Sequence, residues 1–386
     1  MTLGLIMSGG GARGAYEVGV LSYILGDLVR RRGAWPLDFV CGTSVGAING
    51  AFVAASVHDA PAGMARLESM WRAIQLPNVL GFNVTQASRL HRVVLGGRRG
   101  GGLFDATPMT EIIRTGIDYR QLARNLRTGI LKAFTATATH VRTGKPICFV
   151  DRAPGVGLPV GMPRAVGVRS AHIMPHHVLA SAAIPVVFPP VSIRADLYCD
   201  GGLRLNTPLS PAIHLGADKV FVIGLSSEIE APEIASGRYP GLPFLLGKVL
   251  DAFMLDHVNV DLEELGRINE LLADGVTAFG PDFVARLNEA GAARGAPPRR
   301  FVGSFTIRPS QDLGVIAADF LDRERAALRK QLGRTLLRLM DVGEGATAAD
   351  LASYLLFDGG YAQELIALGR RDARESSDEI EAFLYS

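Results

Sequence analysis

Apolar runs alternate with helical patterns over the first part of the chain. Residues 3–7 form a short apolar run that ends in glycines, and residues 15–32 repeat apolar positions at the spacing of a helix. A second apolar run at residues 37–41 leads into a helical pattern of small residues at 45–57. This order predicts a strand, a helix, a second strand and a second helix.

Further apolar runs bounded by turn residues repeat the strand pattern in the middle of the chain. They lie at residues 133–139, 147–150, 186–193 and 219–225. Strands that alternate with helices favour a parallel arrangement, because a parallel connection needs a crossover long enough to hold a helix. The pattern therefore predicts an α/β fold with a mostly parallel central sheet flanked by helices.

The pattern changes after residue 228, where long helical segments follow one another with one strand-like run at 302–308. The helical segments are residues 245–274, 316–340 and 348–371. We therefore expect an α/β domain over residues 1–228 and a mostly helical C-terminal extension over residues 229–386 that packs on it.

Residues 79–103 interrupt the α/β pattern with a basic, glycine-rich segment. Its arginines are Arg89, Arg92, Arg98 and Arg99, and glycine fills most of the positions from 96 to 102. This composition favours no helix or strand, so we expect a mobile surface loop. Two interpretations stay open for this loop, a solvated linker and a lid over a site.

Composition and charge exclude several classes of protein. With 48% hydrophobic and 20% charged residues and a net charge of +2, the chain is neither disordered nor generally polyanion-binding, so we expect no nucleic-acid partner. Three cysteines in apolar runs and eight histidines without metal-ligand spacing indicate no metal site and a cytoplasmic compartment. We also expect no signal peptide, and no apolar run reaches the roughly 18 residues of a membrane span.

Glycine is abundant, with 45 residues in 386, and its first cluster lies at a strand end. This cluster follows the first predicted strand and consists of Gly9, Gly10, Gly11, Ala12, Arg13 and Gly14. A run of backbone N–H groups at a helix start binds anions. The G-x-G-x-x-G spacing also occurs in dinucleotide-binding turns, which need an acidic residue at the end of the second strand. Asp38 lies at the beginning of that strand, so the acidic residue expected at its end is missing. Nucleotide binding therefore stays only an alternative.

The second predicted strand leads directly into Gly42-Thr43-Ser44-Val45-Gly46. A G-x-S-x-G sequence between a strand and a helix makes a sharp turn that exposes a serine hydroxyl, and Gly42 and Gly46 permit this turn. Ser44 is therefore a candidate nucleophile, and the alternative is that it only caps the helix. In a parallel sheet both glycine-rich turns lie at the same edge, so the N–H groups of the first can face Ser44.

Asp200 follows a further strand-like run at residues 197–199 and precedes Gly201 and Gly202. A carboxylate at a strand end is a candidate base for the Ser44 hydroxyl. The alternative is an ordinary Asp-Gly turn. Arg13 likewise has alternative interpretations: it anchors the glycine loop or adds positive potential there, or it is only a surface residue of the first helical turn.

The three motifs resemble those of the patatin-like phospholipase family, in the same order along the chain. They are the glycine cluster at 9–14, the serine turn at 42–46 and Asp200-Gly201-Gly202. Supporting stretches at 180–190 and 206–208 are also similar, and residues 350–358 resemble bacterial members with a helical extension.

The resemblance implies a patatin-like fold and a serine–aspartate dyad. Ser44 would attack an acyl ester, Asp200 would take its proton, and backbone N–H groups around Gly10, Gly11 and Ala12 would hold the oxyanion. The implied activity is hydrolysis of lipid or phospholipid acyl esters without a cofactor. The basic loop and the apolar helices are also compatible with transient contact with an anionic membrane surface.

Two other functions stay open on the sequence alone. An α/β-hydrolase with a serine, histidine and aspartate triad would need His214 or His257 after the acid. That fold places several strands before its nucleophile, whereas Ser44 follows only the second predicted strand. A non-catalytic module that binds lipid, protein or nucleotide would use Ser44 only as a helix cap.

Overall fold

The structure is a computed structural model that describes residues 1–79, 106–227, 258–340 and 349–386. The predicted basic loop at 79–103 lies outside these residues apart from Val79, and so does the predicted domain boundary after residue 228. Whether that loop is a lid and whether the chain divides there both stay predictions.

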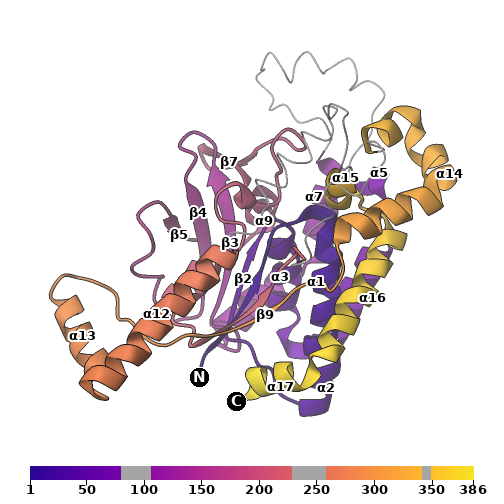
Figure 1. Cartoon of the computed structure of the whole chain (residues 1–386). Helices are drawn as coiled ribbons and strands as arrows, with labels where there is room; N and C mark the ends of the chain where they lie inside the picture. The colour runs from indigo at the N-terminus through magenta and orange to yellow at the C-terminus, as the bar shows by residue number, and fades with distance from the viewer. Residues whose placement is uncertain (80–105, 228–257, 341–348) are drawn as a thin grey trace, which may run out of the picture.

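In the described residues a nine-stranded mixed sheet runs through the centre of the molecule, in the order β5-β4-β3-β2-β1-β8-β9 with the β6–β7 pair attached to β3 (Figure 1). The strands are β1 (Leu3–Met7), β2 (Phe39–Thr43), β3 (Ala133–His140), β4 (Pro146–Arg152), β5 (Gly167–Ser170), β6 (Val191–Ile193), β7 (Asp196–Asp200), β8 (Lys219–Ile223) and β9 (Gly303–Ile307). Five of the strand pairs are parallel, namely β1–β2, β1–β8, β2–β3, β4–β5 and β8–β9. The predicted α/β class with a mostly parallel sheet is confirmed.

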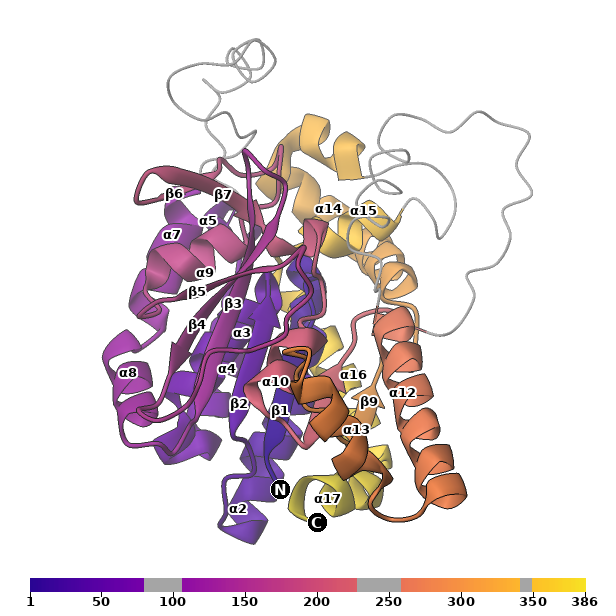
Figure 2. The same cartoon turned by 90° about the vertical axis from the view of Figure 1, so that its left-hand side faces the viewer.

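Helices cover both faces of this sheet (Figures 1 and 2). The described helices are α1 (Gly14–Leu21), α2 (Val29–Arg32), α3 (Val45–Ala55), α4 (Ala60–Arg72), α5 (Leu76–Val79), α7 (Thr107–Gly116), α8 (Tyr119–Arg127), α9 (Pro175–Ser181), α10 (Leu209–Leu215), α12 (Val258–Phe279), α13 (Phe283–Ala292), α14 (Leu313–Met340), α15 (Ala349–Leu355), α16 (Gly359–Glu375) and α17 (Ser377–Tyr385). A π-helical segment at Ser22–Leu28 joins α1 to α2, so the predicted helix over 15–32 is continuous.

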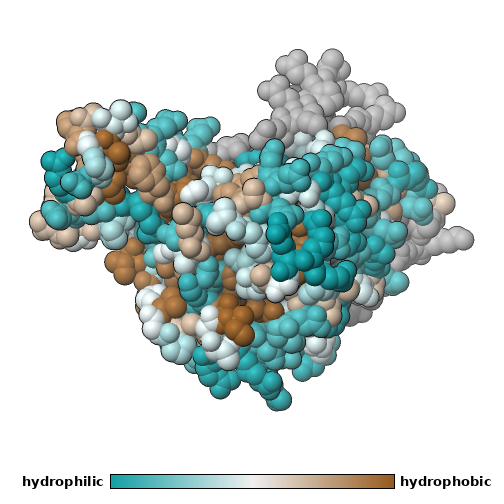
Figure 3. Space-filling view, turned by 90° about the horizontal axis from the view of Figure 1, so that it is seen from below, coloured by the Kyte–Doolittle hydropathy of each residue, from teal (hydrophilic) through white to brown (hydrophobic). Residues whose placement is uncertain are grey.

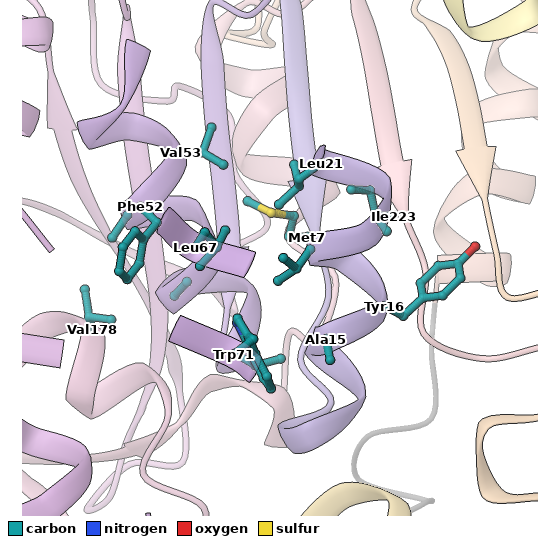
Figure 4. Close-up of a cluster of buried hydrophobic side chains, with 14 of the residues drawn as sticks. Met7, Ala15, Tyr16, Leu21, Phe52, Val53, Leu67, Trp71, Val178 and Ile223 are labelled. Atoms are coloured by element: carbon teal, nitrogen blue, oxygen red, sulfur yellow. The ribbon is translucent and has the colours of Figure 1, made fainter. Parts of the chain in front are cut away.

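The central strands are apolar at successive positions because each face packs against helices. Leu5 and Met7 of β1 belong to the larger cluster, which includes side chains of α1, α3, α4 and α16. Figure 4 shows Met7 among side chains of α1, α3 and α4. Ile6 points to the opposite face, where it joins side chains of α10 and α12. The strand side chains in both clusters are buried, which explains why these strands read as unbroken apolar runs.

Two predicted elements differ from the structure. The strand expected at 186–193 is formed only at Val191–Ile193, since Pro189 and Pro190 lack the N–H groups that a strand needs. The helix expected at 348–371 is divided into α15 and α16, because the Asp358 carboxylate accepts a hydrogen bond from the Gly360 N–H at 2.8 Å and caps a new helix.

The C-terminal residues contribute to the sheet and to the helical layer around it. Strand β9 pairs in parallel with β8, from Lys219 opposite Gly303 to Ile223 opposite Ile307. Helix α16 lies along α1 (Figure 1). The hairpin of α12 and α13 projects from the body (Figures 1 and 3). Leu271 and Phe279 of α12 are exposed. Among the described helices, none combines the length and apolar character needed to cross a bilayer.

Helices α1 and α16 approach each other at two glycines. A Cβ atom added at Gly19 would lie 2.2 Å from the Ile366 carbonyl oxygen, and one added at Gly369 would lie 2.3 Å from the Tyr16 carbonyl oxygen. Neither backbone can retreat without opening the core that Tyr16 and Ile366 share. The two helices therefore cross in backbone contact.

This contact predicts different effects for two glycine-to-alanine changes in helices. Gly369→Ala should lower the free energy of unfolding by about 1–3 kcal/mol, because its methyl group overlaps the α1 backbone. Gly266→Ala in α12 should be neutral or stabilising by up to about 1 kcal/mol, since nothing lies within 4 Å of its Cβ position. Urea denaturation of both variants measures this, and equal midpoints would contradict the close approach.

Candidate active site

The glycine cluster forms a tight loop between β1 and α1. Gly11 has φ of +57°, and a Cβ atom there would lie 2.3 Å from the Tyr354 carbonyl oxygen, so only glycine fits. Residues Gly11–Arg13 form one 3₁₀ turn that continues into α1. The loop thus presents consecutive backbone amides at the edge of the sheet where β1 ends.

Ser44 occupies a strained turn between β2 and α3. Its φ is +55°, in the left-handed region that non-glycine residues rarely adopt. The flanking glycines allow the crowding around it: a Cβ atom at Gly42 would lie 2.2 Å from the Gly46 carbonyl oxygen, and one at Gly46 would lie 2.5 Å from the Met7 carbonyl oxygen. Ser44 precedes α3 but its side chain makes no capping hydrogen bond, so its hydroxyl is available for another partner.

That partner is Asp200, which lies 156 positions later at the end of β7. The Ser44 Oγ donates a hydrogen bond of 2.6 Å to Asp200 Oδ2, and the Gly202 N–H donates one of 2.7 Å to Oδ1. Burial raises the pKa of Asp200 to about 7, although both hydrogen bonds act to lower it. The sheet therefore brings the predicted nucleophile and the predicted base into direct contact.

A third serine, which the sequence did not single out, supports this turn. The Ser44 N–H donates to Ser181 Oγ at 2.9 Å, and Ser181 Oγ donates to the Thr137 carbonyl oxygen at 2.6 Å. Ser181 is fully buried at the end of α9. It lies within the stretch 180–190, but nothing in the sequence marks its hydroxyl as a link between Ser44 and the sheet.

Residues that follow Asp200 hold the glycine loop from the other side. The Gly9 N–H donates to the Asn206 carbonyl oxygen, and Asn206 Nδ2 donates to the Gly9 carbonyl oxygen, both at 3.2 Å. The Ser8 and Thr207 hydroxyls are 2.7 Å apart. The loop and the turn after Asp200 are thus fixed relative to each other.

Arg13 is buried, so the interpretation as a surface residue is wrong. Its side chain is 8% exposed and hydrogen-bonds to Ser353 and Tyr354 of α15. These contacts agree instead with the other interpretation, in which Arg13 anchors the glycine loop.

An apolar pocket adjoins Ser44 and Gly11. Side chains from α3, α4, α5, α7, the segment after α9 and the turn before α16 line it. The lining side chains are Val45, Ile48, Met70, Trp71, Ile74, Val79, Met109, Ile112, Ile113, Ala182, Ile184, Phe188 and Phe357. None of these side chains carries a charge, so the cavity, about 40 Å³ in volume, is an apolar space next to the serine.

A buried polar network, which the sequence also did not reveal, lies behind this pocket. Trp71 Nε1 donates to Asn49 Oδ1 at 3.0 Å, and Asn49 Nδ2 donates to Glu17 Oε2 at 2.8 Å and to the Gly14 carbonyl oxygen at 3.1 Å. Burial raises the pKa of Glu17 well above its usual range. The network connects the pocket wall to the first turn of α1.

Two of the residues invoked by the other functions, His214 and Asp38, have structural partners. His214 Nδ1 lies 2.8 Å from the Ser210 carbonyl oxygen on its own helix, and His257 lies outside the described residues. Asp38 accepts the Leu3 N–H at 2.8 Å and pairs with Lys132. Within the described ranges no cluster of potential metal ligands occurs, and the three cysteines are free thiols.

Comparison with known proteins gives one family. A family model described as patatin-like phospholipase matches residues 5–213, more than half of the chain. Lysophospholipase nte1 of Aspergillus terreus is 25% identical over 232 residues, which are 58% of this chain and 12% of the relative. Calcium-independent phospholipase A2-gamma of Mus musculus is 27% identical over 218 residues, which are 54% of this chain and 25% of the relative. The chain thus spans a quarter or less of these relatives.

A solved structure gives a more distant match. The crystal structure of VipD from Legionella pneumophila aligns with 80% of this chain and 61% of its own length, with 12% sequence identity and a TM-score of 0.32.

The buried carboxyl predicts how stability changes in Asp200→Asn. An aspartate in an unfolded chain ionises near pH 4, whereas burial raises the pKa of Asp200 to about 7 in the folded protein. Ionisation therefore costs the folded state free energy from about pH 4 upward, and the cost is complete above about pH 7. The uncharged variant escapes this cost, which approaches about 4 kcal/mol at roughly 1.4 kcal/mol per pKa unit.

Urea denaturation of the wild-type protein and Asp200→Asn tests this at about pH 4 and about pH 8. The stability advantage of the variant should be larger at the higher pH. An advantage that does not grow with pH would contradict a raised pKa.

Proposed function

The chain belongs to the patatin-like phospholipase family, and on this basis we propose that it is a serine lipid acyl hydrolase with Ser44 as nucleophile and Asp200 as base. The observation that carries the proposal is the buried 2.6 Å hydrogen bond from Ser44 Oγ to Asp200, beside an apolar pocket. Named relatives are a lysophospholipase and a phospholipase A2, which supports an acyl ester of a lipid as the substrate class.

In the acylation step, ionised Asp200 accepts the Ser44 proton while Oγ attacks the ester carbonyl carbon. The carbonyl π electrons move to oxygen and form a tetrahedral oxyanion. Collapse of this intermediate breaks the bond to the leaving alcohol, and Asp200 returns the proton to the alcohol oxygen. The products of this step are a Ser44 acyl ester and the free alcohol or lysolipid.

In the deacylation step, water replaces the alcohol. Asp200 takes a proton from water as its oxygen attacks the acyl carbonyl carbon, and a second oxyanion forms. When the intermediate collapses, Ser44 Oγ leaves and recovers the proton from Asp200. The carboxylic acid departs and the starting dyad is restored.

A carboxylate is usually too weak a base for a serine hydroxyl, and burial corrects part of this mismatch. Because Asp200 is removed from water, its pKa rises to about 7, near the pH at which it must both accept and return a proton. Its direct hydrogen bond to Oγ leaves no need for an intervening imidazole.

Only some N–H groups of the glycine loop at residues 9–14 are proposed to stabilise the oxyanion. The N–H groups of Gly9, Arg13 and Gly14 donate to backbone carbonyl oxygens, and these residues shape the loop. We therefore propose that the N–H groups of Gly10, Gly11 and Ala12 stabilise the oxyanion. The positive end of α1 adds to this potential.

The apolar pocket beside Ser44 is the proposed site for the acyl chain of the substrate. Transient contact with an anionic membrane surface through Arg89 to Arg99 stays a prediction, because those residues lie outside the described ranges. Cytoplasmic location and the absence of a cofactor stay predictions as well.

The dyad predicts which substitutions abolish activity. Ser44→Ala and Asp200→Asn should each reduce hydrolysis of p-nitrophenyl acyl esters by at least about a thousandfold, since each removes a group that takes part in bond formation. Ser44→Ala should also abolish labelling by a fluorophosphonate probe. His214→Ala is the control and should keep wild-type turnover; its inactivity with an intact fold would favour the histidine triad.

Activity should depend on the ionisation of Asp200. Because the carboxylate form accepts the proton, kcat/KM should rise about tenfold per pH unit below about pH 7 and level off above it. Steady-state rates between about pH 5 and about pH 9, with circular dichroism to follow the fold, measure this profile. A rate that is flat across this range would contradict a catalytic base with a pKa near 7.

A further inference from the structure

The segment Ser353–Phe357 comprises the last turn of α15 and the two residues after it, and it lies against the glycine loop, far outside the family match at residues 5–213. We propose that this segment completes the active site: Ser353 and Tyr354 are positioning residues that hold the oxyanion loop through Arg13, and Phe357 forms part of the wall that contacts the acyl chain. This inference rests on the proposed acyl hydrolase function.

The first contact is between Arg13 and two hydroxyl groups. Arg13 Nε donates to Ser353 Oγ at 2.7 Å, and Nη1 donates to the Tyr354 hydroxyl at 3.0 Å. The guanidinium carbon also lies 3.9 Å from the centre of the Tyr354 ring. Two of the N–H groups of this guanidinium are hydrogen-bonded and its plane lies over an aromatic ring, so it has little rotational freedom.

The fixed side chain of Arg13 constrains the loop through the main chain. The Arg13 N–H donates to the Gly10 carbonyl oxygen at 3.1 Å, so the turn that contains Gly11 and Ala12 closes on Arg13. These are the residues whose N–H groups are proposed to face the oxyanion. Displacement of Arg13 would therefore turn those N–H groups away from their target, and oxyanion donors act only when preorganised.

The second contact is made by backbone atoms. The Tyr354 carbonyl oxygen lies only 2.3 Å from the position that a Cβ atom of residue 11 would occupy. The α15 backbone thus limits how far the loop can move outward, and the loop can approach it only because residue 11 has no side chain.

The third contact is with the pocket. Phe357 lines the same apolar pocket as Ser44, and its ring stacks on Trp71 with centroids 6.4 Å apart. Phe357 is only 9% exposed. The pocket wall is therefore completed by a side chain from the C-terminal part of the chain.

The segment is anchored on its C-terminal side. Gly359 begins α16 in backbone contact with α4, since a Cβ atom there would lie 2.1 Å from the Arg72 carbonyl oxygen. The glycine contacts between α1 and α16 hold the rest of the helix. Residues 353–357 are thus fixed to the two helices, α1 and α4, that border the pocket and the loop.

The positioning role is tested with the double variant Ser353→Ala/Tyr354→Phe, which removes both hydroxyl acceptors of Arg13 and keeps the tyrosine ring. The expected result is a fall in kcat of about tenfold or more with KM within about twofold, because a misplaced oxyanion donor weakens the transition state and not the substrate complex. The rate of fluorophosphonate labelling should fall by a similar factor, since the probe also forms an oxyanion.

Tyr361→Phe is the matched control. It removes a buried tyrosine hydroxyl from the same C-terminal part, but that hydroxyl donates to the Leu313 carbonyl oxygen at 3.1 Å. Its kcat should match that of the wild-type protein at a comparable loss of thermal stability. If the double variant keeps kcat within about twofold of this control, the positioning role is overturned; the single variants Ser353→Ala and Tyr354→Phe decide the point in the same way if the double variant does not fold.

The pocket role is tested with Phe357→Ala. Loss of this ring widens the pocket, so the ratio of kcat/KM for a decanoate ester to that for a butyrate ester should rise by about threefold or more. Phe383→Ala removes a ring of α17 that packs at a tilt against the ring of Phe305 in β9, with centroids 5.6 Å apart, and it should leave the ratio unchanged. An unchanged ratio in Phe357→Ala would exclude the ring from the acyl site.

Failure of this inference is distinct from failure of the proposed function. If the wild-type protein neither hydrolyses esters nor labels at Ser44, the proposed function is wrong. If the wild-type protein is active and both sets of C-terminal variants behave as their controls, the function stands and residues 353–357 are only structural.

Discussion

The hydrogen bond between Ser44 and Asp200 depends on keeping water away from a carboxylate. Exposed to solvent, Asp200 would ionise near pH 4 and would be a poor base for a hydroxyl. Enclosed between β3, β7 and α9, its pKa rises to about 7. Burial without partners would be too costly for such a group, and the hydrogen bonds from Ser44 and the Gly202 N–H supply the necessary compensation. The other features of the site maintain this enclosure.

Close backbone approach is the means by which the enclosure is built. Gly42, Gly46 and Gly201 each lie where a methyl group would overlap a neighbouring carbonyl oxygen, so β2, α3, β1 and β3 meet without side chains between them. This crowding also holds Ser44 at a positive φ that it would not adopt in a free chain. Ser181 supports the strained turn by accepting a hydrogen bond from the Ser44 N–H.

The same principle extends to the C-terminal part of the chain. Gly11, Gly19 and Gly359 allow the backbone of α15 and α16 to lie directly on the loop, on α1 and on α4. Arg13 adds a charged hydrogen bond across this boundary, and Phe357 adds an apolar wall. A catalytic region delimited by the family match alone would lack these contacts. The proposed active site is therefore made from both parts of the sequence.

The amino-acid sequence by itself determined the α/β class, the positions of the central strands along the chain, and the candidates Ser44 and Asp200. These features are local: alternation of apolar runs and the glycines of sharp turns are written in neighbouring residues. The strand predicted at 186–193 is shorter in the structure because Pro189 and Pro190 interrupt it. The helix predicted at 348–371 is two helices because a single capping hydrogen bond from the Gly360 N–H to Asp358 starts a new one. Tertiary structure alone decided the roles of Ser181, Glu17 and Asn49, the burial of Arg13, and the place of Phe357 in the pocket. Each of these depends on contacts between residues that are distant in sequence, and hydrogen bonding and desolvation act through space, where a one-dimensional pattern carries no signal.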